Sequence, residues 1–267
     1  VNIATAPVGQ LIPPTTAFIV FSAAGGGASV AALFMAGWIP GLLWAACCMV
    51  VAFFYARKQG YVIKRDKLTA KIVGKTIWDA IPSLFLVVII IGGILSGKFT
   101  PTEASGVAVA YAFILSVFIY RTIKLSEIPK LLVDAAVMTT IVMLIIGASS
   151  VLSFVMSFTG LPAAISKLVL GISSNKYVIL LILNIFLLIV GTFMDMAPAL
   201  LIFTPIFLPI VQSFGMSPIH FGVMMVMNLS VGTITPPVGN VLFVGCSVAK
   251  LRVEQVMKHL IPLFVAI

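Results

Sequence analysis

The chain has 267 residues, of which 61% are hydrophobic and only 9% are charged. Soluble domains carry about 25% charged residues. The composition therefore excludes an ordinary water-soluble enzyme or nucleic-acid-binding protein, despite a formal net charge of +9. The excess of Lys and Arg instead suits the cytoplasmic loops of a membrane protein. We predict an all-α, polytopic protein that lies in a lipid bilayer.

Apolar segments of spanning length alternate with basic clusters in the first half of the chain. Residues 38–56 form one such segment, and residues 57–75 hold seven of the 16 basic residues. Residues 77–94 and 101–120 form two more, joined by a short loop at Lys98, and the second returns to another basic cluster. Because Lys and Arg concentrate in cytoplasmic loops, segment 57–75 is predicted to be cytoplasmic.

The second half is richer in helix breakers than a set of plain spans would be. Residues 131–156 are predicted to cross the membrane, and residues 161–174, which are short and mixed in polarity, to form an interfacial helix. In residues 177–249 the only acidic or basic side chains are Asp195 and His220. This stretch is nevertheless interrupted by Gly191, Pro198, Pro205, Pro209, Gly215, Pro218, Gly232, Pro236, Pro237 and Gly239. Breakers at membrane depth are tolerated where backbone is buried in protein or lines a cavity, which predicts broken helices and a re-entrant hairpin.

A weak internal repeat places two Pro-Pro pairs in matching positions. Residues 8–14 (VGQLIPP) resemble residues 231–237 (VGTITPP) at an offset of 223 (231 − 8). The Ile-Pro pair at 39–40 recurs at 261–262. Internal symmetry with matched Gly and Pro breaks is typical of the binding site of a secondary transporter.

The Pro pairs have a direct consequence for the backbone. Pro lacks the N–H that would bond the carbonyl four residues earlier, so the pairs deprive four carbonyls of helical partners. These belong to Gly9, Gln10, Gly232 and Thr233. Hard cations bind such oxygens, and the half-helix that follows each pair favours an anion. One break thus offers cation ligands beside an anion site, as symport requires. Alternatively, Ser, Thr or water satisfies the carbonyls and the pairs only kink the helices.

Polar side chains beside the breaks are candidate ligands. Thr15 and Thr16 follow the first Pro pair and Asn240 follows the second, so a substrate carboxylate is predicted to bind there. Hydrogen bonds to nearby backbone are the alternative for these three side chains. Thr235, in the second break, and Asp195, an intramembrane carboxylate, are predicted to serve the sodium site or its gating. For Asp195, capping of the next helix or an unseen partner is the alternative.

Residues 100–103 (TPTE) have the pattern of a capping box, with Thr at the N-cap, Pro at the first helical position and Glu at the third. This pattern predicts a structural helix start, with a direct substrate role as the less favoured alternative.

Three segments resemble the large membrane subunit of TRAP transporters, the tripartite ATP-independent periplasmic systems. They are residues 92–104 (GGILSGKFTPTEA), residues 191–195 (GTFMD), and residues 220–223 (HFGV) continuing to 228–239 (NLSVGTITPPVG). The resemblance covers essentially the whole chain. By position, the chain is expected to begin near the end of the first of the family's two inverted halves.

The resemblance implies an elevator-type secondary transporter of the bacterial inner membrane, with inverted repeats, broken helices and a re-entrant hairpin. A transport domain would carry an organic acid such as sialic acid, a C4-dicarboxylate or a sugar acid past a fixed scaffold domain. Sodium would be the coupling ion, with no other cofactor. The implied partners are a small four-helix membrane subunit and a periplasmic substrate-binding protein.

Carried over by position, the hairpin spans residues 177–213, turns at 191–195 and faces a broken helix at residues 228–240. Because the family places sodium at such junctions, the resemblance adds Gly191 and Thr192 to the predicted ion site. The predicted sodium residues are Gly9, Gln10, Gly191, Thr192, Asp195, Gly232, Thr233 and Thr235.

The implied domains divide the chain into three parts. Residues 1–35 would end the first transport repeat, residues 36–130 would form scaffold and arm helices, and residues 131–267 would form the second transport repeat.

Three other functions compete with a sodium symporter. A proton-coupled or exchanging antiporter on a related broken-helix fold is the runner-up, but proton relays need buried titratable groups, which are scarce here. An ion channel could use carbonyl rings, yet paired breaks suit an occluded site better. An intramembrane enzyme would need a nucleophile with a base, or metal ligands. The chain has only two His and neither an HExxH nor a GxSxG motif, so we predict that it is not an enzyme.

Overall fold

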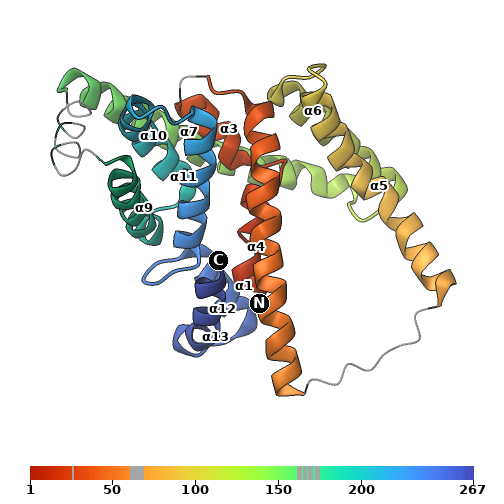
Figure 1. Ribbon diagram of the computed structural model, residues 1–267. Coiled ribbons are helices and arrows are strands. Elements are labelled where there is room, and N and C mark those ends of the chain that lie inside the picture. The colour runs from red at the N-terminus through yellow and green to blue at the C-terminus, as the bar shows by residue number, and fades with distance from the viewer. Residues whose placement is uncertain (26, 61–68, 161–163, 165–166, 168–170, 172–174) are drawn as a thin grey trace. The chain divides into compact units, whose positions relative to one another are not determined.

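All regular elements are helical in the computed structural model, which describes residues 1–25, 27–60, 69–160, 164, 167, 171 and 175–267 (Figure 1). The prediction of an all-α polytopic protein is confirmed, because six of these helices are long and apolar enough to cross a membrane. The six are Val30–Lys58, Ile72–Leu95, Pro101–Ile119, Leu125–Ala148, Lys176–Phe193 and Met196–Ser213. The pair Asn2–Leu11 and Thr16–Ala24, bent by 48°, also has the composition of a span.

The chain separates into two compact units. Unit 1 comprises Val1–Lys58 and Leu144–Ile267, and unit 2 comprises Gln59–Met143. The domain boundaries predicted at 35/36 and 130/131 lie inside α4 (Val30–Gln59) and α7 (Ile128–Phe158), which are both continuous helices.

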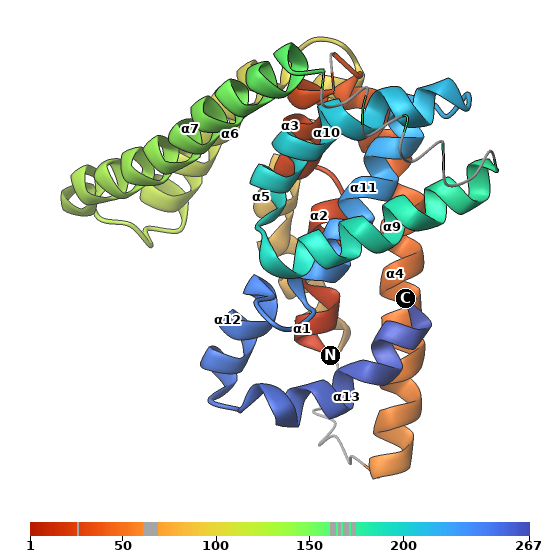
Figure 2. The same ribbon diagram turned by 90° about the vertical axis from the view of Figure 1, so that its left-hand side faces the viewer.

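Unit 1 holds both predicted breaks and the predicted hairpin. Besides α4 and the end of α7, its helices are α1 (Asn2–Thr5), α2 (Val8–Leu11), α3 (Thr16–Ala24), α9 (Lys176–Phe193), α10 (Met196–Ser213), α11 (Pro218–Thr233), α12 (Asn240–Ala249) and α13 (Val253–Ala266). Helix α11 packs against α9, α10, α2 and α3, and α12 packs against α1 and α13 (Figure 2).

The core of unit 1 lies where α3, α10 and α11 meet. Helix α10 buries one side against α3, with Leu200 and Val211 wholly inaccessible to solvent. On α11, Gly222 admits the Phe21 ring, because an added Cβ would lie 2.5 Å from Phe21 Cε1. Phe21 in turn meets Phe221 edge to face at 6.2 Å between ring centroids. This tight packing holds the two breaks on one body.

Both Pro pairs interrupt their helices, whereas single Pro residues do not. Helix α2 ends before Pro13-Pro14 and α11 before Pro236-Pro237, and both Pro-Pro peptide bonds are cis. Helix α10 continues through Pro205 and Pro209, which were expected to be breaks, and α4 continues through Pro40. One missing N–H costs a helix one hydrogen bond, whereas an adjacent pair removes two from the same turn.

Helices α9 and α10 form the predicted hairpin, with only Met194 and Asp195 between them. The expected interfacial helix at 161–174 lies almost entirely outside the described residues, as do residues 61–68 of the expected cytoplasmic segment 57–75.

Unit 2 is formed by α5 (Ala70–Leu95), α6 (Pro101–Ile114), the π-helix η1 (Leu115–Ile119), the 3₁₀ turn η2 (Leu125–Glu127) and the first part of α7. The predicted capping box at the start of α6 is confirmed. The Glu103 amide donates to Thr100 Oγ1 at 3.3 Å, and the Thr100 amide donates to Glu103 Oε2 at 2.8 Å. These bonds satisfy two N–H groups that a helix start otherwise leaves free.

Candidate ion and substrate site

The tip of the hairpin touches the second helix break through two glycines. Gly191 on α9 and Gly232 on α11 are both buried. A Cβ added to Gly232 would lie 2.3 Å from the Gly191 carbonyl carbon, and one added to Gly191 would lie 3.1 Å from Gly232 Cα. The two backbones are therefore in direct contact, which only Gly permits on both sides. Two residues predicted for the ion site are thus brought together.

Three backbone carbonyls converge on Gly239, which is buried and has a φ of 24°. The Thr192 carbonyl, at the hairpin tip, accepts from the amides of Val238 and Gly239, each at 3.3 Å. A Cβ added to Gly239 would lie 2.6 Å from the Thr235 carbonyl oxygen and 3.1 Å from that of Thr233. The oxygens of Thr233 and Thr235 therefore border the space that a side chain at position 239 would fill, while the oxygen of Thr192 lies at the Gly239 amide.

This arrangement fits a small hard cation. Such ions take oxygen ligands, and backbone carbonyls are among them. The Thr233 carbonyl receives no hydrogen bond from any described residue, because its helical partner would be the nitrogen of Pro237. The Thr192 carbonyl has only long hydrogen bonds, beyond the usual 2.7–3.2 Å range. Gly239 was absent from the predicted ion site. Its position shortly after a Pro pair was the feature of the sequence that could have indicated it.

None of the four carbonyls accepts the helical bond that Pro removes, as predicted, but two of them have other partners. The Gly232 carbonyl accepts from the Thr235 amide at 2.9 Å, because the chain tightens into a turn after α11. The Gln10 carbonyl accepts from Thr15 Oγ1 at 3.0 Å. For the other two, no donor is found among the described residues. Each break therefore keeps one carbonyl that is free to bind a cation.

Asp195 does not cap α10, contrary to the capping alternative. It occupies the N-cap position, yet its side chain makes no capping hydrogen bond. Its Oδ1 accepts instead from Asn240 Nδ2 at 3.1 Å. Asn240 is the first residue of α12, so the carboxylate lies where the positive end of that helix favours an anion. The structure thus joins a residue predicted for sodium to one predicted for substrate.

At the first break, Thr15 hydrogen-bonds to nearby backbone, which was the stated alternative to binding substrate. Its Oγ1 accepts from the Ala17 amide at 3.2 Å and donates to the Gln10 carbonyl. Thr15 is buried and is the N-cap of α3, whereas Thr16 is exposed at the first position of that helix. Of the two threonines, Thr16 is the one placed to meet a ligand from solvent.

Side-chain hydrogen bonds connect the two breaks and brace the second. Ser230 Oγ, which is buried, donates to Gln10 Oε1 at 3.0 Å and so ties α11 to α2. The hydroxyls of Thr233 and Thr235 each donate to a carbonyl on α11 at 2.7 Å. At these two threonines the backbone oxygen, rather than the hydroxyl, faces Gly239. Ser230 was missed because a single Ser in an apolar helix carries no distinguishing pattern.

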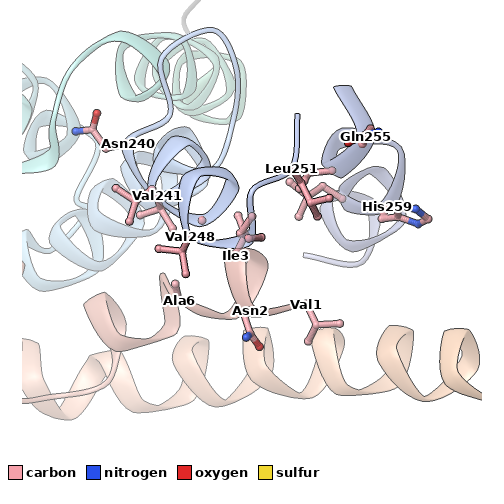
Figure 3. A pocket seen from close by; sticks show the side chains of 15 residues that line it. Val1, Asn2, Ile3, Ala6, Asn240, Val241, Val248, Leu251, Gln255 and His259 are labelled. Atoms are coloured by element: carbon pink, nitrogen blue, oxygen red, sulfur yellow. The ribbon is translucent and has the colours of Figure 1, made fainter. Parts of the chain in front are cut away.

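A pocket of about 940 Å³ lies among α1, α12 and α13 (Figure 3). Its wall is mainly apolar, with side chains such as Ile3, Val241 and Val248. Asn240 lies at one end, and its amide is turned away from these apolar groups. The pocket is therefore mainly apolar, although Asn2 and Gln255 also line it, and the carbonyls described above lie instead at the hairpin tip and the second break.

Comparison with known proteins places this site in a family. The model of the tripartite ATP-independent periplasmic transporter, DctM component, matches residues 1–267. The uncharacterised protein YgiK of Salmonella typhimurium is 49% identical over 100% of this chain and 61% of its own length. The C4-dicarboxylate TRAP transporter large permease protein DctM of Pseudomonas aeruginosa is 39% identical, over 96% of this chain and 59% of its own length.

The sialic acid TRAP transporter large permease protein SiaM of Vibrio cholerae is 36% identical, over 97% of this chain and 60% of its own length. The chain thus spans about three fifths of the length of these curated relatives. Together with the six apolar helices, the family match identifies a multi-pass protein of the bacterial inner membrane. The chain belongs to the DctM family, the large permease component of TRAP transporters, whose members are permeases rather than enzymes.

Proposed function

We propose that this chain is part of a permease that takes up an organic acid by sodium symport. The observation that carries the proposal is the convergence of three carbonyls on Gly239, in a chain of the DctM family. The family membership supports organic-acid transport, since relatives are named for sialic acid and C4-dicarboxylates. The convergence supports sodium as the coupling ion.

Sodium would bind at the junction of the hairpin tip and the second break. The carbonyl oxygens of Thr192, Thr233 and Thr235 would supply ligands from one side. Asp195 lies within the same junction through its bond to Asn240 and would add negative charge. A carboxylate attracts a cation about 4 Å away by roughly 1 kcal/mol in water and by more where protein or lipid excludes water. At the first break, the free carbonyl of Gly9 offers a start for a second ion site.

The substrate carboxylate would bind at the start of α3 or α12, where free N–H groups and the helix dipole favour an anion. Thr16 is exposed at the first of these positions. At the second, Asn240 already donates to Asp195, so a substrate carboxylate would compete for that amide. Sodium bound beside Asp195 would weaken this internal bond and release Asn240 for substrate. Sodium and substrate would then each favour the binding of the other.

The transport step would follow the elevator scheme of the family resemblance. The hairpin tip and the second break share a direct backbone contact, so they would move as one part of a transport domain. A small four-helix membrane subunit and a periplasmic substrate-binding protein complete the proposed system. Their support is family membership, since the name of the family denotes a tripartite system.

The test is uptake of labelled sialic acid or succinate into proteoliposomes that hold the full-length permease with its small subunit. Uptake is measured with sodium or with potassium outside, and with or without the cognate binding protein. We expect uptake to need both sodium and the binding protein. Sodium-independent uptake that follows a proton gradient would favour the antiporter alternative, and uptake without the binding protein would contradict the tripartite assignment.

Three substitutions localise the ion site in the same assay. Gly239→Ala should raise the sodium concentration for half-maximal uptake most, because its Cβ enters the space between the carbonyls. Asp195→Ala and Thr235→Ala should weaken sodium dependence without preventing membrane insertion. Gly106→Ala on α6, where an added Cβ meets nothing within 4 Å, is the matched control. Unchanged sodium activation in all three variants would remove this junction from the ion site.

A further inference from the structure

We propose that Asn184 and Asn228 are positioning residues for the ion site, because their amide pair sets the register of α9 against α11. The two side chains join the long helices that carry Gly191 and Gly232, well away from the hairpin tip. The proposal rests on the sodium-coupled function above and adds to it two residues that touch neither ion nor substrate.

The two amides are tied to each other and to their own helices. Asn228 Nδ2 donates to Asn184 Oδ1 and to the Met224 carbonyl, the latter at 2.8 Å. Asn184 Nδ2 donates to the Leu180 carbonyl at 2.7 Å and lies 3.6 Å from Met224 Sδ. Both asparagines are half-buried. Each side chain is therefore held in one orientation, and the bond between them joins two fixed points.

The pair and the glycine contact lie on the same seam between α9 and α11. On α9, Asn184, Leu187 and Gly191 are spaced by three and four residues, which places them on one helix face. On α11, Asn228 precedes Gly232 by four residues, again on one face. Seven residues separate Asn184 from Gly191, about 10 Å along the helix axis. The seam thus has a hydrogen bond between side chains at Asn184 and Asn228 and, further along the helix axis, a backbone contact at Gly191 and Gly232.

Apart from the contact between Gly191 and Gly232, the remainder of this seam does not select a register by itself. Leu187 and Leu229 are wholly buried in it. Leu side chains pack against one another about as well as against lipid tails, so they favour no single alignment strongly. Hydrogen bonds between amides are directional, and a slip of one residue would break the bond that joins the two helices.

The register matters because it decides where the Thr192 carbonyl points. A slip of one residue turns α9 by about 100° relative to its neighbour. Thr192 follows Gly191 directly, so this turn would carry its carbonyl away from Gly239 and would open the convergence of the three oxygens. The asparagine pair therefore acts on sodium through the hairpin tip.

The experiment compares single and double leucine variants of the full-length complex in proteoliposomes. Asn184→Leu and Asn228→Leu each leave one amide without its partner across the seam, so both should lose thermal stability and sodium affinity. The double variant leaves no such amide, so its thermal stability should recover. Its half-saturating sodium concentration should stay raised, by roughly 2- to 30-fold, the range for residues that influence a site through others. Its maximal rate at saturating sodium should stay close to that of the parent.

Gln212→Leu on α10 is the matched control, because it replaces an exposed amide away from the seam. A double variant with parental sodium affinity would overturn the proposal and leave the pair a purely structural role. Sodium-independent uptake by the parent itself would instead refute the proposed function.

A cross-linking measurement tests the register whatever the coupling ion is. Cysteines at Thr192 and Val238, whose backbones are hydrogen-bonded at 3.3 Å, are introduced after removal of Cys47, Cys48 and Cys246. Oxidation should cross-link this pair rapidly in the parent and several times more slowly in the double leucine variant. Equal rates in the two proteins would overturn the proposal.

Discussion

At the scale of single residues, backbone atoms dominate the candidate site. Three carbonyl oxygens and three glycines define it, and the threonine hydroxyls at positions 233 and 235 are used to brace α11. Backbone oxygens suit a sodium site, since a carbonyl binds a cation without a change of protonation. It also explains why few titratable side chains are needed in this half of the chain.

The contact between Gly191 and Gly232 leaves little room for a side chain at either position. Gly232→Ala should force α9 and α11 apart, because the new Cβ would lie 2.3 Å from the Gly191 carbonyl carbon. Overpacking of this kind costs about 1–3 kcal/mol. We expect a lower melting temperature in detergent and a strong loss of sodium-driven uptake. Gly92→Ala, which meets no neighbour within 4 Å, should change neither measurement appreciably. A stable, fully active Gly232→Ala protein would contradict the contact.

At the scale of elements, pairs of prolines and single prolines act differently. The two pairs end helices and expose carbonyls, while α10 runs through Pro205 and Pro209 without a break. Tertiary packing decides the outcome for a single Pro. Much of α10 is buried against its neighbours, which support a helix with two missing hydrogen bonds.

The capping box at the start of α6 is predicted to serve only the stability of that helix. Thr100→Ala removes the hydroxyl that accepts from the Glu103 amide, so it should destabilise the helix start by about 1 kcal/mol. Thermal unfolding in detergent would measure this loss, and Thr100→Ser, which keeps the hydroxyl, should largely avoid it. The substrate concentration for half-maximal uptake should not change in either variant. A specific rise in that concentration would revive the substrate role of residues 100–103.

At the scale of the whole molecule, the chain combines two units of different character. Unit 1 contains both breaks, the hairpin and the buried core that holds them together. Unit 2 has long helices that expose many apolar side chains, such as Trp78, Leu84 and Val109. Exposed apolar helices are what a bilayer or a membrane partner covers, so the described surface of unit 2 is consistent with its membrane location.

The order of spans and basic clusters predicts a topology. An impermeant thiol reagent should label a cysteine at Lys98 from the periplasmic side of intact cells. Cysteines at Lys58 and Lys124 should be labelled only after the membrane is permeabilised. The reason is that one span, α5, separates position 58 from position 98, and α6 with η1 returns the chain to position 124. Labelling of the cysteines at positions 58 and 98 from the same side would contradict this topology.

The sequence by itself determined the class of the protein, the helix start at Thr100, the hairpin and both interrupted helices. These follow from local causes: hydrophobic length, capping chemistry and the missing N–H groups of adjacent prolines. The same local causes predicted too many breaks in α10, because they omit the packing that supports a single Pro.

Only the tertiary structure decided which atoms meet. Gly191 and Gly232 are 41 residues apart (232 − 191), and their contact depends on how α9 lies against α11. The bonds of Asp195 to Asn240 and of Ser230 to Gln10 likewise join distant segments. No local pattern encodes such pairings, because an Asp or Gln accepts from any donor that the fold brings within reach. The free carbonyls were thus predictable in kind, whereas their convergence on Gly239 was a property of the folded chain.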